Sequence, residues 1–79
     1  MNADKLVHMA NQIGQFFAAM PDAAEARDGI ANHLQRYWPP SMRHELLQAM
    51  DAGEAAELAP LVREAMLKLR TARAADSAA

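Results

Sequence analysis

The stretch His33-Leu-Gln-Arg-Tyr-Trp-Pro-Pro-Ser-Met-Arg-His44 divides this 79-residue chain between two helical segments. It contains the only tyrosine, the only tryptophan and two of the four prolines. A residue that precedes a proline is pushed out of the α-helical region, so Trp38, which precedes Pro39, is predicted to be extended. Pro40 suits the first turn of a helix, where its missing N–H would have no partner. We therefore predict that one helix ends at Tyr37 and that the next begins at Pro40.

Helical signals continue on the N-terminal side of this break. Residues 5–20 show the clearest periodicity, because their apolar side chains recur at steps of three and four. These side chains are Leu6, Met9, Ala10, Ile13, Phe16, Phe17 and Met20. Pro21 predicts that this first helix ends near Met20. Asp22 and Glu25 then have the spacing of a capping box, which predicts the start of a second helix.

Two further boundaries lie on the C-terminal side. Gly53 is a natural stop for the third helix, and Pro60 opens a last one. The predicted fold class is all-α, a small bundle of about four short helices, with residues 1–70 as a single helical domain. Residues 71–79 are rich in alanine and have little to bury, so they are predicted to form a flexible, disordered C-terminal tail.

The core of such a domain is lean. Hydrophobic residues make up 52% of the chain, but 19 of them are alanines, which contribute little apolar surface. Domains of this size usually gain stability from a disulfide, a structural metal or a partner. The chain has no cysteine, which removes the disulfide and the commonest zinc sites. A partner subunit is the route to stability that remains.

The chain offers little for catalysis. His8, His33 and His44 fall on three different predicted helices without the spacing of a helical metal pair, and the three glycines are too scattered for a phosphate loop. We therefore predict no catalytic, cofactor-binding or metal-binding residue. A net charge of −2 and a pI near 5.8 argue against nucleic acid as a partner. No signal peptide or membrane-spanning run is visible, so a cytoplasmic location without membrane contact is expected.

One segment has the opposite charge balance from the whole chain. No acidic residue lies between Asp28 and Glu45, whereas arginines, histidines and the Tyr-Trp pair do. Tyrosine, tryptophan and arginine often carry the binding energy of interfaces, so we predict a partner-binding patch here, together with one of two adjacent phenylalanines. The predicted partner-binding residues are Phe17, His33, Arg36, Tyr37, Trp38, Pro40 and Arg43. An alternative is that Tyr37 and Trp38 plug one end of the bundle.

Four blocks of the sequence, in order, resemble a known family. They are Lys5-Leu-Val-His-Met-Ala-Asn-Gln-Ile-Gly-Gln-Phe-Phe17, Gly29-Ile-Ala-Asn-His-Leu34, Tyr37-Trp38 with Pro40 and Met42-Arg43, and Pro60-Leu-Val-Arg63. Together they resemble the delta subunit of the molybdenum-containing, NAD-dependent formate dehydrogenases. The sequence departs from the family pattern at Pro39, where an acidic residue is usual, and at Ser41, where arginine is frequent.

The resemblance implies a small non-catalytic subunit of a cytoplasmic complex that oxidises formate and reduces NAD. In such complexes the large catalytic subunit carries bis-molybdopterin guanine dinucleotide and iron–sulfur clusters, and other subunits carry FMN and further clusters. The leading hypothesis is an accessory subunit that docks on the large catalytic subunit and supports its assembly or stability. The alternative is a transient maturation factor that helps to insert the molybdenum cofactor, with Arg36 and Arg43 facing the cofactor's phosphates.

Overall fold

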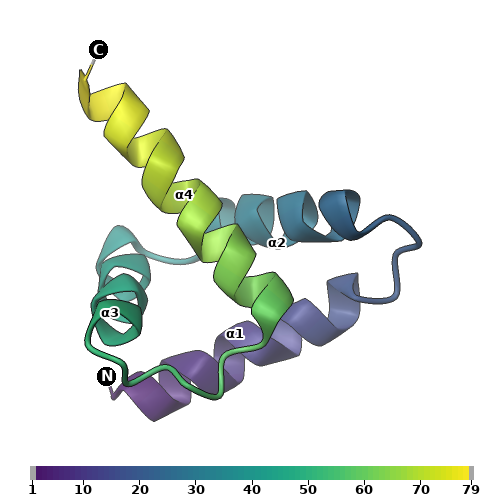
Figure 1. The fold of residues 1–79 in the computed structure, drawn as a ribbon, viewed down its shortest axis with the longest axis horizontal. Coiled ribbons are helices and arrows are strands. Elements are labelled where there is room, and N and C mark those ends of the chain that lie inside the picture. Colours follow the sequence, from purple (N-terminus) through teal and green to yellow (C-terminus); the bar gives the residue numbers. More distant parts are fainter. Residues whose placement is uncertain (1, 79) are drawn as a thin grey trace.

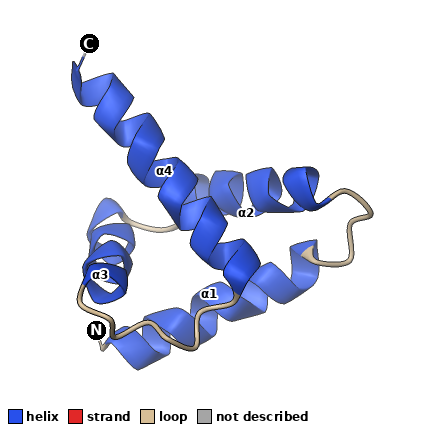
Figure 2. Cartoon of the chain, in the orientation of Figure 1, coloured by secondary structure: helices blue, strands red, loops and turns tan. Residues whose placement is uncertain are grey.

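The computed structural model describes residues 2–78 of the chain, with side chains up to Thr71. It contains four helices, α1 (Ala3–Phe17), α2 (Ala23–Tyr37), α3 (Pro40–Asp51) and α4 (Pro60–Ala78). No strand occurs in the described residues, and Figure 2 shows helices joined by loops alone. The prediction of a small all-α bundle is therefore confirmed. The flexible tail predicted for residues 71–79 falls, apart from Thr71, outside the residues whose side chains are described.

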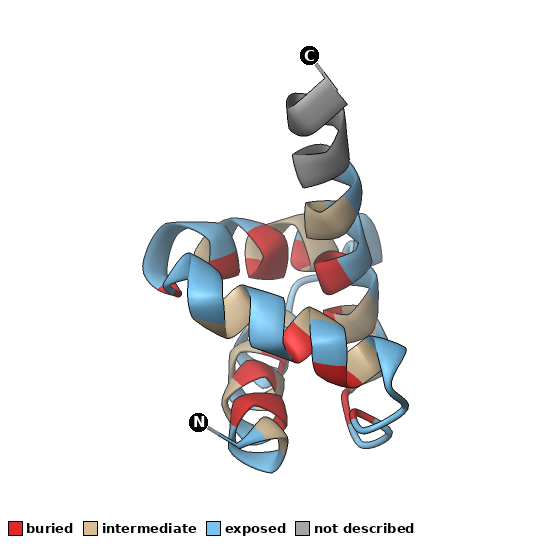
Figure 3. Cartoon of the chain, turned by 90° about the vertical axis from the view of Figure 1, so that its left-hand side faces the viewer, coloured by how far each residue is buried: buried red, intermediate tan, exposed pale blue. Residues whose placement is uncertain are grey.

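The four helices are arranged around a pair formed by α1 and α2. After α1 the chain turns back, so that α2 returns beside it (Figure 1). α3 lies at the end of this pair where α1 begins and α2 ends, and α4 crosses over both helices. Side chains from all four helices meet in one core, and Figure 3 shows the buried residues on the inward faces of the helices.

The core combines a few large side chains with many alanines. The large side chains that are completely buried are Leu6, Ile30, Leu34, Leu46, Val62 and Met66. Between them lie the buried alanines Ala10, Ala26, Ala31, Ala49, Ala55 and Ala65. Alanine at these positions lets the helix backbones approach closely, which compensates in packing for the small amount of apolar surface.

Most helix boundaries follow from the local signals in the sequence. Asp22 is the N-cap of α2, and its Oδ1 accepts a hydrogen bond from Ala24 N–H at 2.8 Å. Gly53 follows the end of α3 with a φ of 75°, in the left-handed region that glycine adopts without strain. Gly53 N–H donates to Met50 O at 3.2 Å, and Glu54 N–H donates to Ala49 O at 2.8 Å. These are the two hydrogen bonds of a Schellman motif.

The predicted end of α1 near Met20 is wrong by about one turn, because the helix stops at Phe17. Ala18 N–H still donates to Gly14 O at 2.8 Å, and Met20 N–H donates to Phe17 O in a tighter turn at 3.0 Å. Pro21 disfavours a helical Met20, as expected. In addition, residues 18–22 are used to reverse the chain direction so that α2 can pack beside α1. That requirement comes from the tertiary fold rather than from the local sequence.

One polar side chain of α1 holds the segment that leads into α4. Asn11 Nδ2 donates to Glu57 O at 3.0 Å, and Asn11 Oδ1 accepts from Ala59 N–H at 2.8 Å. Arg63 Nη2 then donates back to Ala55 O at 2.7 Å. The connection between α3 and α4 therefore has a defined path, although it contains no helix or strand of its own.

Two exposed ion pairs attach α4 to its neighbours. Lys68 donates to Asp28 on α2, and Arg70 Nη2 donates to Asp51 on α3 at 2.7 Å. The hydrogen bond from Lys68 holds the pKa of Asp28 below its ordinary value. The pair is therefore intact at neutral pH, and its contribution is lost as the pH falls through that lowered pKa. Exposed pairs of this kind contribute little to stability, so the position of α4 depends mainly on its apolar face.

The closest approach between α1 and α4 occurs at Gly14. A Cβ atom at this position would overlap Val62 Cγ2, and Val62 is completely buried. We expect Gly14→Ala to lower the free energy of unfolding by about 1–3 kcal/mol, because overpacking outweighs a gain in helix propensity of about 1 kcal/mol. Urea denaturation measures this change. Gln15→Ala, at the exposed neighbouring position, is the control, and equal stability of the two variants would contradict the close crossing.

Candidate functional site

An apolar groove of about 470 Å³ opens between α1 and α2. Its lining residues are Met9, Gln12, Ile13, Phe16, Phe17, His33 and Trp38. The α1 residues Met9, Gln12, Ile13 and Phe16 recur at steps of three and four, so they form one stripe along that helix. Apart from Gln12, His33 and the indole N–H of Trp38, the lining side chains are apolar. The groove is therefore a continuous apolar surface with very few hydrogen-bonding groups.

The rings of Phe16 and Phe17 have different environments. Phe16 is 77% exposed, whereas Phe17 is half-buried against the core. The two rings meet edge to face, with centroids 5.2 Å apart. Adjacent residues of a helix point about 100° apart, which is why only one ring can pack inward. The predicted patch contains Phe17, but Phe16 is the ring that the fold leaves open to solvent.

Four of the predicted patch residues lie together in a row that borders the groove. The ring centroids of Phe17 and His33 are 6.2 Å apart, and those of His33 and Tyr37 are 4.8 Å apart. Tyr37 is 66% exposed, and the guanidinium carbon of Arg36 lies 5.9 Å from the centroid of its ring. These four residues are therefore neighbours in the fold, and their contacts with a partner stay a prediction.

A glycine allows the phenylalanine ring to join this row. A Cβ atom on Gly29 would lie 2.6 Å from Phe17 Cδ1 and 2.7 Å from its Cε1, which is closer than any normal contact. The ring of Phe17 consequently rests directly on the backbone of α2. This contact sets the depth of the groove at the end that Phe16 borders.

Trp38 belongs to the core as well as to the groove. Its side chain is 7% exposed and packs with the buried residues of all four helices, while it forms part of the groove lining. Its backbone is extended, with φ −86° and ψ 134°, as the following proline requires. Trp38 therefore closes one end of the bundle, as the alternative interpretation of the aromatic pair predicted, whereas Tyr37 lies on the surface.

Arg43 has a structural role inside the chain. Its Nη1 donates to Leu34 O at 3.2 Å, to Gln35 O at 3.0 Å and to Trp38 O at 2.7 Å. Leu34 O also accepts from Trp38 N–H at 3.1 Å, so Arg43 is a second donor to this carbonyl. All three carbonyls lie at or just beyond the C-terminal end of α2, where the helix dipole favours a cation. Pro40 begins α3 beside this junction and does not line the groove. Partner contacts of Pro40 and Arg43 stay predictions.

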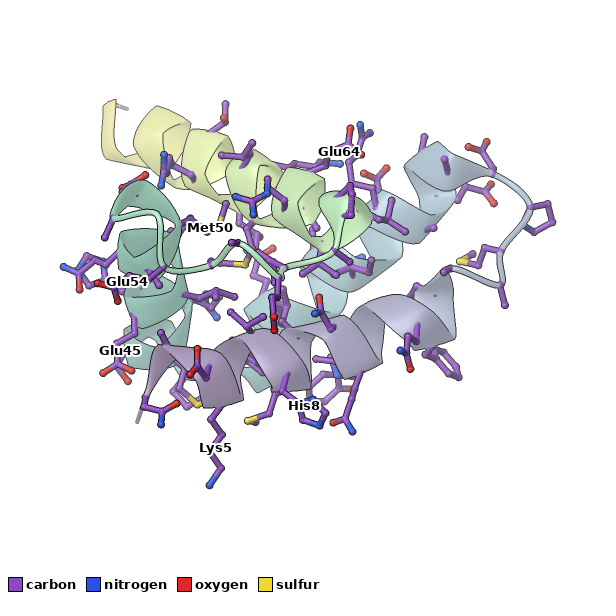
Figure 4. All side chains as sticks on the ribbon, turned by 60° about the horizontal axis from the view of Figure 1, so that its bottom comes forward. Lys5, His8, Glu45, Met50, Glu54 and Glu64 are labelled. Atoms are coloured by element: carbon purple, nitrogen blue, oxygen red, sulfur yellow. The ribbon has the colours of Figure 1, made fainter. Side chains whose placement is uncertain are left out.

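None of the residues that line the groove is acidic. The groove is built from segments 5–21 and 29–44, and neither contains an aspartate or a glutamate. Lys5 lies one turn before Met9 on the same stripe, and Figure 4 shows Lys5 and His8 pointing away from α1 on the same side. His33 lines the opposite wall, and Arg36 lies about one turn after it on the same side of α2. The sequence prediction identified only the second acid-free segment, because the proximity of the first depends on the fold.

The described part of the chain contains neither a metal-binding cluster nor a membrane-spanning helix. No group of three or more histidine, cysteine, aspartate or glutamate side chains there could hold a metal ion. None of the helices there is long and apolar enough to cross a membrane. The groove is thus the feature of this chain that best fits a functional site, and its chemistry is that of a binding surface.

Comparison with known proteins gives one finding. A family model described as NADH-dependant formate dehydrogenase delta subunit FdsD matches residues 5–66. The match covers most of the chain and includes all the residues that line the groove. No curated protein and no solved structure matches the chain.

Removal of the tryptophan ring tests its place in the core. We expect Trp38→Ala to lower the free energy of unfolding by about 3–5 kcal/mol, as for other large-to-small core substitutions. Tyr37→Ala is the matched control, and we expect it to cost at most about 1 kcal/mol, the value of a single aromatic contact. Thermal and urea unfolding of the isolated chain measure both values, and a Trp38→Ala variant as stable as the control would contradict burial of the ring.

Removal of the two arginine side chains near the end of α2 is expected to lower the stability of the chain by different amounts. Arg43→Ala removes a charged donor from three carbonyls and should cost about 1.5–3 kcal/mol. Arg36→Ala removes an exposed contact with Tyr37 and should cost about 0.5–1 kcal/mol. Urea denaturation of the two variants in parallel separates these effects. Equal losses would show that Arg43 does not cap α2.

Proposed function

The chain belongs to the family of NADH-dependent formate dehydrogenase delta subunits, and we propose that it is a non-catalytic accessory subunit that binds the large catalytic subunit through the groove. The observation that carries this proposal is an open apolar groove with Phe16 77% exposed beside it, within the segment that matches the family. A small chain gains nothing by itself from leaving a phenylalanine in water. Burial of such a side chain against a partner contributes about 1.5–3 kcal/mol.

The proposed role is to support assembly or stability of the catalytic subunit. A partner that binds only the folded chain also stabilises that chain by mass action. The lean, alanine-rich core makes this reciprocal effect important here, because the free chain has little apolar surface to bury. In the proposed arrangement the cofactors of the complex, namely bis-molybdopterin guanine dinucleotide, iron–sulfur clusters and FMN, are carried by other subunits. The complex would act in the cytoplasm.

The alternative role is that of a transient maturation factor that helps to insert the molybdenum cofactor. In that role Arg36 and Arg43 would contact the phosphates of the cofactor. The contacts within the chain favour the accessory role, because Nη1 of Arg43 already donates to three backbone carbonyls and Arg36 lies by the Tyr37 ring. The two guanidinium groups therefore do not form a ready phosphate clamp.

Purification of the complex distinguishes the two roles. We expect an affinity-tagged chain, expressed with the other subunits, to copurify with the large catalytic subunit and to remain in the active enzyme at a constant ratio. Omission of the chain should then reduce the yield of assembled enzyme. A chain that never brings down the catalytic subunit would disprove the proposal. A chain absent from the finished enzyme, whose omission lowers only the molybdenum content, would favour the maturation role.

A further inference from the structure

The chemistry of the groove restricts the backbone conformation of whatever fills it. Its lining side chains provide hydrogen-bonding groups only from Gln12, His33 and the indole N–H of Trp38, and the rest of the lining is apolar. An extended peptide laid into such a surface would leave several of its own N–H and C=O groups without partners, at a cost in free energy for each. A helix satisfies its backbone hydrogen bonds internally and presents only side chains. The groove therefore fits an α-helix.

The length of the lining stripe sets the scale of that helix. The lining residues of this stripe run from Met9 to Phe16, and together with Lys5, one turn before them, the stripe spans 11 residue steps of α1, or about 16 Å at 1.5 Å per residue. A partner helix of about three turns covers this distance. Its contacts with the groove would come from apolar side chains at steps of three and four, the usual pattern of a helix that binds in a groove.

The charges at the edges of the groove restrict the polar residues of that helix. The walls come from segments 5–21 and 29–44, which contain no acidic residue. Lys5 lies one turn before the lining residue Met9, and Arg36 lies about one turn after the lining residue His33. The acidic residues that make the whole chain negative lie elsewhere in the sequence. Complementary charge across an interface raises the association rate and selects the partner. Acidic side chains beside the apolar face of the helix fit these edges.

A second copy of this chain fits the groove poorly. In a symmetric dimer the same patch faces itself, so the edges with Lys5 and Arg36 would meet edges of the same charge. A close approach of like charges at an interface is unfavourable. The occupant that fits the groove is therefore a different protein.

We infer that the groove binds an amphipathic helix of a partner protein that carries acidic residues beside its apolar face. The inference rests on the proposed function for the identity of the protein that supplies this helix, a subunit of the formate dehydrogenase complex. Beyond the proposed function, the inference states that the bound segment is helical and that it carries negative charge. Phe16 would provide the main apolar contact, and Lys5 and Arg36 would face the acidic residues.

The first arm of the test changes the apolar contact in the coexpressed complex. We expect Phe16→Ser to weaken binding of the catalytic subunit by about tenfold or more, the loss typical of a central aromatic residue of an interface. Phe16 is exposed, so the substitution leaves the fold of the chain intact. Leu67→Ser is the matched control, since Leu67 is 43% exposed on α4 and does not line the groove. We expect this control to bind as the unchanged chain does.

The second arm changes the charge. Arg36→Glu should weaken binding by about tenfold, with a smaller difference in high salt because screening reduces the repulsion. Lys68→Glu makes the same change of charge on α4, where Lys68 contacts Asp28. Asp28 and His33 are five residues apart, so they point about 140° apart around α2 and the control lies away from the groove. We expect Lys68→Glu to leave binding unchanged.

The third arm identifies the bound segment directly. A photoreactive phenylalanine analogue at position 16 is crosslinked in the intact complex, and mass spectrometry locates the attached peptide. We expect an amphipathic segment with aspartate or glutamate beside its apolar residues. Exchange of one of these acids for lysine should restore binding to the Arg36→Glu variant. A crosslink to a segment without acidic residues, or to a second copy of the chain, would overturn the inference.

The outcomes separate this inference from the proposed function. If the unchanged chain fails to copurify with the catalytic subunit, the proposed function itself fails. If the unchanged chain copurifies, and Phe16→Ser and Arg36→Glu do so equally well, the proposed function stands and the inference about the groove is wrong. Circular dichroism of each variant confirms that loss of binding does not come from loss of the fold.

Discussion

The close crossing of α4 over α1 determines which side of α1 is left open for the groove. At Gly14 the two helices approach so closely that Val62 occupies the space of a side chain. Three residues earlier on the same side of α1, Asn11 bonds both to Glu57 and to Ala59 and so directs the chain into α4. These contacts use one side of α1 for packing. The stripe through Met9 and Phe16 lies on another side, which α4 does not cover, and it becomes the wall of the groove.

The break between α2 and α3 does more than end one helix and begin the next. Tyr37 is the last residue of α2 and lies on the surface, whereas Trp38 is extended and enters the core. Arg43 reaches back from α3 and donates to carbonyls at the end of α2, which holds the two helices at a defined angle. Because Trp38 is both core and groove lining, the shape of the groove is coupled to the packing of the whole bundle. The shape of the groove and the stability of the fold are therefore linked through one side chain.

The features that could be predicted from the sequence are those with local causes. The N-cap at Asp22, the first turn at Pro40 and the glycine after α3 each depend on neighbours within a few residues, and each was predicted. Asn11 bonds to Glu57 and Ala59, which lie 46 and 48 positions further along the chain, and no local pattern indicates these two contacts. The exposure of Phe16 rather than Phe17 depends on Gly29, which receives only one of the two rings. Tertiary contacts decide which of the two rings is exposed. The periodicity of the sequence could therefore indicate Phe16 and Phe17 as candidates but could not select between them.

The family match covers the part of the chain that forms the core and the groove. The match begins at Lys5, at one end of the groove stripe, and ends at Met66, the last fully buried side chain of the described residues. It thus includes the crossing at Gly14, the two contacts of Asn11 and the groove. The exposed ion pairs of Lys68 and Arg70 lie beyond it, and pairs of this kind contribute little to stability. The matched segment is therefore the part of the chain in which packing and the candidate binding surface depend on each other, and a change to the core would alter the groove at the same time.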